Sequence, residues 1–327
     1  MSSAENVVRL VADRTIALGY RSWNWGEGVA QYALGEAGFA LDESRYTAEV
    51  QNFLRDNQDL QPQRLEQVMP SIAALFVHER MGDPLGLELA SRVANMLKTH
   101  PRSHHGAFTV TPVRTVWVDY IYETAPFLCH LARVTGERRY QEWAIDQTLA
   151  YLMSCWNPRE RLVHHVYYDD VGAPNPFLWA RANGWTALGL VEMLNLVPAE
   201  YGLQSFLARF LRHLAARLAE LQHESGHWHT VLLDPRTQLE PATTAMISLA
   251  LKRGVRDGWL GAEFEGTADR AWQAVKGSID ESGNVTGVSA ETPPGDADDY
   301  EATEVGVYPW GQGFTILAGL DRVQHGQ

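Results

Sequence analysis

One segment of the chain, residues 111–136, carries a carboxylate in strongly apolar surroundings. Asp119 follows Trp117 and Val118 and precedes Ile121, and its neighbours are typical of a buried helix face. A bare carboxylate in such a place is costly, so it must be ion-paired, hydrogen-bonded or kept partly protonated for a purpose. The last case is the one that would allow proton transfer, which makes Asp119 the first candidate for chemistry.

A second candidate group surrounds Arg181 in the segment "FLWARANGW". Arg181 lies between Trp179 and Trp185, and Gly184 lets the backbone approach a neighbour closely. A guanidinium between two indole rings, at the end of a loop and the start of a helix, could clamp a planar carboxylate. Pairing with one of the 40 acidic residues of the chain would explain it equally well, so both interpretations stay open.

Histidines form the third group. His164 and His165 are adjacent in "LVHHVYYDD", where one of the pair usually faces the core and the other a cavity. The clusters "HPRSHH" and "HESGHWH" lack a carboxylate or cysteine partner at ligand spacing on a helix, so we expect no metal. The glycines of "WNWGEGVAQYALGEAG" do not follow a strand, so we also expect no dinucleotide cofactor.

Composition narrows the class of protein. The 327 residues carry a net charge of -13, which argues against nucleic acid as a partner. Cys129 and Cys155 offer neither a disulfide framework nor a metal spacing, and we expect reduced core thiols. We expect no membrane span, no signal peptide, no obligate protein partner and a cytoplasmic location. The 11 tryptophans, many beside glycines and polar residues, are typical platforms for sugar rings.

The elements that must position these residues are helices. Apolar residues recur at spacings of three and four, and short breaks such as "MGDP" at 81 and "TGER" at 135 separate paired helices. The breaks recur about every 55 to 65 residues, so five or six hairpins fit the length. Such hairpins must pack side by side, as a closed ring or an open stack. Long loops rich in Trp, His and Gly favour the ring, because they could converge on one mouth. We expect a single domain over residues 1–327.

The motifs together resemble a known family. "VWVDYIYETAPFLCHLARVTGERRY", "LVHHVYYDD", "WARANGW" and "YPWGQG" are similar, in order and spacing, to the unsaturated glucuronyl and rhamnogalacturonyl hydrolases. The resemblance is to glycoside hydrolase family 105, a relative of family 88, and runs from about Trp23 to Leu320. It implies an all-α fold, the (α/α)6 barrel of six hairpins. It also implies removal of a Δ4,5-unsaturated uronic acid from the non-reducing end of lyase-generated oligosaccharides, by hydration of the C4=C5 enol ether.

The resemblance also implies roles for single residues. Asp119 matches the family's acid/base position in "WVD", and His165, in preference to His164, would contact the sugar near the reacting carbons. Arg181 and Trp185 would hold the uronate carboxylate and stack on the ring. The other aromatic residues expected beside the ring, in the cavity or at its mouth are Trp179, Trp23, Trp25, Trp228 and Trp310.

One position departs from the family's pattern. The family usually carries a second Asp in a "D-x-I-N" turn some fifty residues before the acid/base, and the matching turn here is "LEQVMPS". Glu66 or Gln67 stands at that position, and Glu66 could serve with a longer reach.

Two other functions compete with the hydrolase. An α/α-toroid sugar epimerase or isomerase would use paired histidines, for which "HPRSHH" and "GHWH" are candidates. A non-catalytic helical-repeat scaffold would not need the Trp–Arg–Asn–Gly–Trp segment or a buried Asp.

Overall fold

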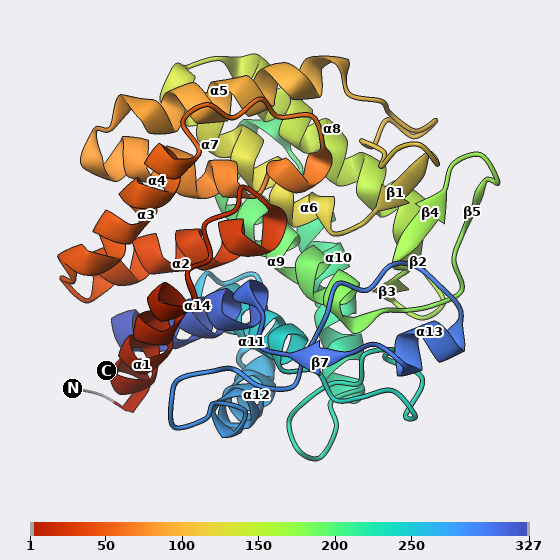
Figure 1. Cartoon of the computed structure of the whole chain (residues 1–327). Helices are drawn as coiled ribbons and strands as arrows, with labels where there is room; N and C mark the ends of the chain where they lie inside the picture. The colour runs from red at the N-terminus through yellow and green to blue at the C-terminus, as the bar shows by residue number, and fades with distance from the viewer. Residues whose placement is uncertain (1–2, 326–327) are drawn as a thin grey trace.

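The structure, a computed structural model that describes residues 3–325, is a ring of helical hairpins with short strands in its loops (Figure 1). The inner helices are α2 (Trp25–Ala40), α4 (Pro70–Met81), α7 (Ala125–Thr135), α9 (Ala180–Leu196), α11 (Pro241–Arg256) and α14 (Pro309–His325). The outer helices are α1 (Ser3–Leu18), α3 (Ser44–Asp56), α5 (Pro84–Thr99), α8 (Arg138–Cys155), α10 (Gln204–Glu220) and α12 (Glu265–Gly277). Shorter helices are α6 (Tyr120–Glu123), α13 (Ala297–Glu301), η1 (Leu65–Gln67), η2 (Ala199–Tyr201) and η3 (Ala262–Phe264).

Burial separates the two rows of helices. Helix α9 buries 14 of its 17 residues, whereas α10, of the same length, buries 6 along one stripe. A helix that is apolar all round must be enclosed, while one with a single apolar stripe can face water. Each inner helix packs against its inner neighbours, and α14 packs against α2, so the row is closed. The prediction of a six-hairpin ring is confirmed, and the open stack is excluded.

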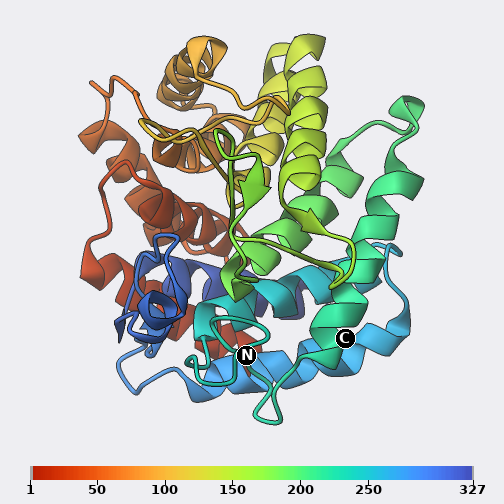
Figure 2. The same ribbon diagram turned by 90° about the vertical axis from the view of Figure 1, so that its right-hand side faces the viewer.

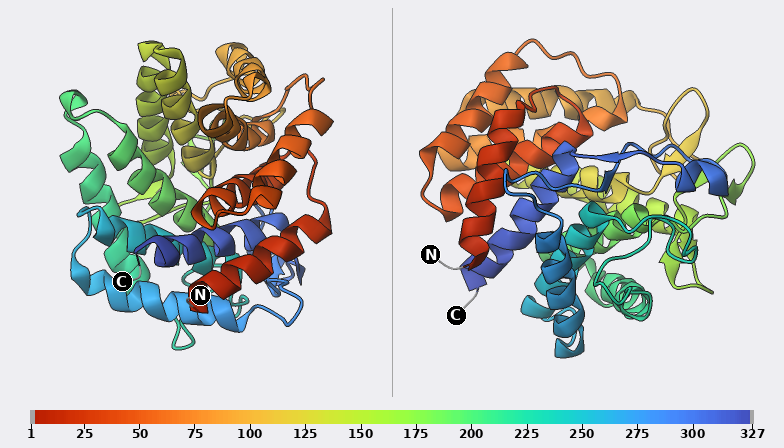
Figure 3. Two further views of the ribbon diagram at one scale, coloured as in Figure 1. Left: turned by 90° about the vertical axis from the view of Figure 1, so that its left-hand side faces the viewer. Right: turned by 60° about the horizontal axis from the view of Figure 1, so that its bottom comes forward.

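The sixth hairpin joins the two ends of the described chain. Five hairpins pair neighbours in sequence, as in α4 with α5 and α7 with α8, but the outer helix α1 packs against the inner helix α14 (Figure 3). The predicted break "MGDP" is the α4–α5 turn. Gly82 ends α4 with a positive φ of 72°, and the Asp83 carboxylate then accepts from the Leu85 N–H to begin α5.

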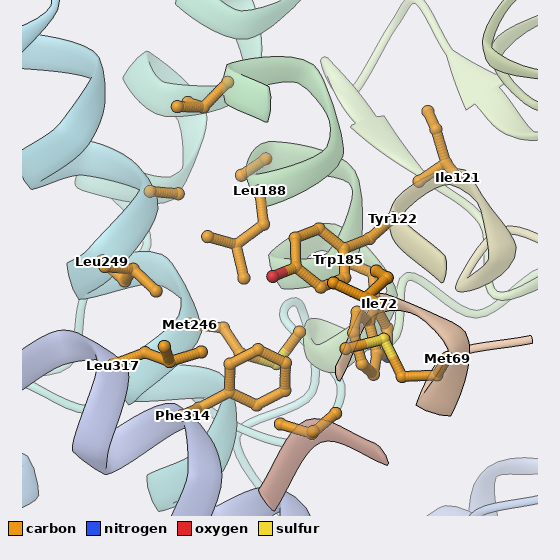
Figure 4. Close-up of a cluster of buried hydrophobic side chains, with 14 of the residues drawn as sticks. Met69, Ile72, Ile121, Tyr122, Trp185, Leu188, Met246, Leu249, Phe314 and Leu317 are labelled. Atoms are coloured by element: carbon orange, nitrogen blue, oxygen red, sulfur yellow. The ribbon is translucent and has the colours of Figure 1, made fainter. Parts of the chain in front are cut away.

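The centre of the ring is filled with side chains. Large apolar residues from five segments of the inner wall meet there (Figure 4): Met69, Ile72, Ile121, Tyr122, Trp185, Leu188, Met246, Leu249, Phe314 and Leu317. This core is the base on which polar residues at the ring's mouth can be held. Cys129 and Cys155 are buried and not linked by a disulfide. None of the helices within residues 3–325 is long and apolar enough to cross a membrane.

Strands and long loops gather at one end of the ring (Figures 1 and 2). An antiparallel sheet joins β1 (Thr115–Trp117), β4 (Val166–Tyr168) and β5 (Ala173–Pro174). Two further pairs are β2 (Trp156–Asn157) with β3 (Leu162–Val163), and β6 (Val288–Ser289) with β7 (Val305–Gly306). The expected convergence of the loops on one mouth is therefore confirmed.

Helix α2 packs closely against the start of α4 at Gly28. A Cβ on Gly28 would lie 2.6 Å from the backbone nitrogen of Pro70, an approach that only a backbone shift can relieve. We expect Gly28→Ala to lower the free energy of unfolding by about 1 to 3 kcal/mol, as overpacking does. Urea unfolding measures this. Gly277→Ala is the control, because nothing lies within 4 Å of its added Cβ. Equal stability of the two variants would contradict the tight contact.

Candidate active site

A cavity of about 250 Å³ opens at the loop-rich end of the ring. Its walls come from the starts of α2 and α9, from η1, from the β1–α6 segment and from the loop after β6. The lining residues are Trp25, Glu66, Val110, Trp117, Asp119, Tyr120, Glu123, Trp179, Arg181, Glu291, Thr292 and Pro293. Carboxyl groups, one guanidinium and aromatic rings thus share a small space, which suits a compact, polar ligand with apolar ring faces.

Asp119 lies at the turn between β1 and α6. We expected Asp119 and its apolar neighbours to form one buried helix face. That prediction is wrong for the residues that precede Asp119, because Val116 and Trp117 belong to β1 and pair with β4. A β-branched and an aromatic residue favour a strand once a partner strand is present, and that partner lies about fifty residues away in sequence. The turn directs the Asp119 carboxyl into the cavity instead of along a helix.

Burial dominates the electrostatics of Asp119. It raises the pKa of this carboxyl from its ordinary 3.8 to about 7, against the opposing effects of the Arg181 charge and the nearby Trp185 indole. Within the described range 3–325, Oδ2 is buried without a hydrogen-bond partner and Nε1 of Trp185 has none either, so the two groups approach without forming a well-aligned bond. Asp119 can therefore give up and regain a proton near neutral pH.

Arg181 is 2% exposed and is held by a loop from the far end of the sequence. Nη1 donates to the backbone oxygen and Oγ of Ser289 at 3.0 and 2.9 Å, and Nη2 donates to the oxygen of Ala290 at 2.9 Å. Nε has no partner, and one Nη2 hydrogen is uncommitted. No carboxylate of the described residues forms an ion pair with Arg181, so the alternative of a simple structural ion pair is not what the structure shows.

Glu240 supports Arg181 indirectly, a role that no motif in the sequence indicated. It precedes α11, and its carboxylate accepts from the backbone N–H groups of Ala242 and Thr243 at the start of that helix. The same carboxylate accepts from the Ser289 N–H at 3.1 Å. Glu240 therefore fixes the strand residue whose oxygens hold the guanidinium of Arg181. Burial lowers the pKa of Arg181, and the charge of Glu240 is the largest effect opposing that.

Three of the predicted tryptophans surround the guanidinium. Its carbon lies 4.4 Å from the ring centre of Trp179, 5.3 Å from that of Trp310 and 5.8 Å from that of Trp25. Trp25 and Trp310 stack with ring centres 4.3 Å apart, and Trp25 donates to Glu291 at the cavity's rim. Cation–π contacts thus stabilise this guanidinium, which is ion-paired with none of the carboxylates that the structure describes.

The other predicted tryptophans are not among the residues that line the cavity. Trp185 belongs to the central core (Figure 4), and Trp228 is fully buried and donates to the backbone oxygen of Leu218. Trp23 donates to the backbone oxygen of Gln67 and so holds the η1 turn. The roles predicted for these three rings in substrate contact stay predictions.

The structure distinguishes between Glu66 and Gln67. The Gln67 side chain accepts from the backbone N–H groups of Gln63 and Arg64, so it caps η1, whereas Glu66 lines the cavity. Two further carboxyl residues line the cavity, Glu123 and Glu291, and neither was predicted. The spacing of four residues between Asp119 and Glu123 would have placed both on one helical face.

The histidine pair lies behind the cavity wall. His165 is fully buried, with its ring centre 4.0 Å from that of Trp179, and its Nδ1 lies 2.6 Å from the Tyr300 hydroxyl. Burial and the Arg181 charge hold the pKa of His165 well below its usual value, so the ring is neutral. His164 faces Asn157 instead. Contact of His165 with the sugar stays a prediction, and this geometry shows it supporting the Trp179 ring.

No histidine from the described part of the chain lines the cavity, which removes the feature on which the epimerase alternative depended. Within residues 3–325, moreover, no three His, Cys, Asp or Glu side chains come together in a way that could hold a metal ion. The side chains in the cavity include a carboxyl whose pKa is about 7 (Asp119), a guanidinium held in place by hydrogen bonds (Arg181) and the faces of aromatic rings. Together with the α/α ring, this set is typical of a carbohydrate-active enzyme.

Comparison with known proteins identifies the family. Residues 10–325 match glycosyl hydrolase family 88, and the chain belongs to this family of glycosidases. It is 28% identical over 326 residues to the unsaturated rhamnogalacturonyl hydrolase YesR of Bacillus subtilis, covering 95% of this chain and 92% of YesR. The fold matches the crystal structure of a possible member of family 105 from Salmonella enterica, with a TM-score of 0.93, 20% identity and coverage of 100% and 96%. It also matches the unsaturated glucuronyl hydrolase of Bacillus sp. GL1, with a TM-score of 0.79, 15% identity and coverage of 98% and 95%.

The raised pKa of Asp119 predicts a pH-dependent effect on stability. Because the folded-state pKa is about 7 and the ordinary value 3.8, ionising Asp119 destabilises the fold progressively between these values and fully above them. Asp119→Asn removes this penalty. We expect the variant to melt at a higher temperature than the wild type at pH 8, with the difference shrinking as the pH falls towards 4.

Asp169→Asn is the matched control with the opposite sign. Burial alone would raise the pKa of Asp169, but hydrogen bonds from His104 and the charges of His104 and Arg114 bring it below its ordinary value. This variant should therefore melt earlier than the wild type at pH 8. If Asp119→Asn also melted earlier, Asp119 would be a stabilising partner of Arg181 instead of a strained acid. Differential scanning calorimetry across the pH range separates the two cases.

Proposed function

We propose that this glycosidase removes a Δ4,5-unsaturated uronic acid from the non-reducing end of lyase-generated oligosaccharides. The observation that carries the proposal is the shared cavity of Asp119 and Arg181. There an acid with a pKa of about 7 faces a guanidinium that no carboxylate of the described residues pairs with. A uronate supplies both a carboxylate for the guanidinium and a reactive double bond for the acid. The similarity to a named unsaturated rhamnogalacturonyl hydrolase along almost the whole chain supports the same substrate class.

The reaction is a hydration followed by ring opening. The proton of Asp119 adds to C4 of the enol ether, and the positive charge that develops at C5 is shared with the ring oxygen. Water then adds to C5 while its proton returns to Asp119, so the acid is regenerated. The resulting hemiketal opens, and the aglycone departs without direct attack on the anomeric carbon. Most glycosidases need two carboxylates that flank the glycosidic bond, whereas this route needs one group that both gives and takes a proton.

Arg181 and the aromatic rings orient the sugar in this scheme. The uncommitted Nη2 hydrogen and the positive charge of Arg181 attract the uronate carboxylate, which is bonded to C5 and so determines where the double bond lies. Trp25 and Trp179 offer faces on which the ring can stack. A pKa of about 7 keeps a substantial fraction of Asp119 protonated at neutral pH, as the first step requires.

Removing the transferable proton tests the mechanism. Asp119→Asn keeps the shape of the side chain, so it should still bind an unsaturated disaccharide while turnover falls roughly 10²- to 10⁴-fold, the contribution of a positioned acid/base. The loss of ultraviolet absorbance of the enol ether measures turnover. Asp169→Asn, outside the cavity, should stay active. A fully active Asp119→Asn enzyme, or a wild type that leaves the absorbance unchanged, would overturn the proposal.

Replacing the guanidinium tests substrate orientation. Arg181→Lys keeps the charge but loses the contacts to Ser289 and Ala290 and the hydrogen aimed at the uronate. We expect kcat/KM to fall roughly 10- to 150-fold, equivalent to about 1.5 to 3 kcal/mol for a hydrogen bond to a charged group.

Arg322→Lys is the matched control for this substitution. Arg322 is also partly buried over a tryptophan, and it donates to Ser248 and to backbone oxygens, but it lies on α14 away from the cavity. Its replacement should lower stability without changing kcat/KM. Equal kinetic effects of the two substitutions would show that Arg181 acts only through the general stability of the fold.

A further inference from the structure

Glu123 is a buried carboxyl that the mechanism above does not use. It is the last residue of α6 and follows Asp119 by four residues, so the two side chains lie one turn apart on the same face. Both line the cavity, with Glu66 of η1 as a third carboxyl. Only 3% of Glu123 is exposed. It therefore lies in the wall of the cavity, beside the proposed acid, and does not reach open solvent.

Glu123 has no hydrogen-bond or ion-pair partner among residues 3–325. Its carboxyl makes no hydrogen bond within the described part of the chain, and Oε2 is buried and unpaired. The groups facing it are Asp119, Glu66, Tyr120 of its own helix and Tyr151 of α8, all of them acids or phenols. No described cation forms an ion pair with it, so nothing offsets the cost of its ionisation.

These surroundings determine its protonation state. Burial, and after it the negative charges of Asp119 and Glu66, hold the pKa of Glu123 well above its ordinary range. Any negative charge on Asp119 adds to the cost of ionising Glu123. Burial and these charges therefore favour the neutral acid form of Glu123, which offers one O–H donor and one carbonyl acceptor.

An unpaired donor and acceptor in a cavity wall are costly unless a ligand satisfies them. We propose that Glu123 is a substrate-binding residue, which as a neutral acid donates a hydrogen bond to a ring hydroxyl of the uronate and accepts one from it. The inference rests on the proposed function. A hydroxyl is the partner that matches, because it both gives and takes a hydrogen bond, whereas the carboxylate of the same sugar is attracted to Arg181. No proton is transferred by Glu123 in this role.

Two substitutions separate this role from proton transfer. Glu123→Gln keeps an uncharged donor and acceptor of the same size, and should retain kcat/KM within about 3-fold of the wild type. Glu123→Met fills the same space without polar atoms, and should lower kcat/KM roughly 10- to 100-fold. Glu123→Met should melt no earlier than the wild type, since it removes an unpaired buried carboxyl. The matched control is Glu36→Met at a distant cavity, which should leave kcat/KM unchanged.

Substrate analogues identify the hydroxyl. Two unsaturated disaccharides serve as probes, one whose uronate lacks the hydroxyl at C2 and one whose uronate lacks it at C3. We expect the wild type to turn over one of these two analogues more slowly than the parent disaccharide. For that analogue, Glu123→Met should cause no further loss, because the hydrogen bond is already absent.

The outcomes are distinguishable. Equal losses in Glu123→Gln and Glu123→Met would mean that Glu123 transfers a proton, and an unchanged kcat/KM in Glu123→Met would mean that it does not touch the sugar. Either result overturns this inference while the wild type still consumes the disaccharide. A wild type that does not consume the disaccharide overturns the proposed function itself, and the inference with it. If Glu123→Met failed to fold, a wild type that turned over both deoxy analogues at full rate would still overturn the inference.

Discussion

The site depends on keeping two opposite charges in one cavity without letting them neutralise each other. Arg181 is held by backbone oxygens and a hydroxyl, not by a carboxylate, and tryptophan rings cover its faces. The positive charge of Arg181 lowers the pKa of Asp119, but burial raises that pKa by more. An ion pair between them would lower the pKa of Asp119 and occupy the guanidinium. The loop that holds Arg181 therefore keeps both groups available to a substrate.

Holding the guanidinium in this way requires the closed ring. Ser289 and Ala290 lie more than one hundred residues after Arg181, and Glu240 at the start of α11 fixes Ser289 from a third segment. Only a ring brings the starts of α9 and α11 and the loop after β6 to a common mouth. The filled centre beneath them (Figure 4) gives these segments a fixed base. Close packing such as Gly28 against Pro70 links the aromatic wall at Trp25 to the η1 turn that carries Glu66.

The carboxyl groups of the cavity differ because their surroundings differ. Asp119 faces a positive charge and its pKa is about 7, whereas Glu123 faces only acids and phenols and its pKa is held well above the ordinary range by burial. Glu66 reaches the same space from a separate turn, η1. Identical functional groups within one cavity can thus differ in how readily they lose a proton, because local burial and charge set the pKa of each.

The sequence by itself determined the helical hairpins, the motifs of the family and two central residues of the site. Apolar spacing and turn residues such as Gly82 are local, so they could be read along the chain. An acid in apolar surroundings and an arginine between indoles indicated Asp119 and Arg181 for the same reason. The tertiary structure alone decided that oxygens of Ser289 and Ala290, not a carboxylate, hold Arg181. It also decided that Asp119 follows a strand and that His165 lies behind the wall. These outcomes depend on which distant segments of the chain come into contact. The burial and the hydrogen bonds of a polar side chain are set by those contacts, not by the residues beside it in the sequence.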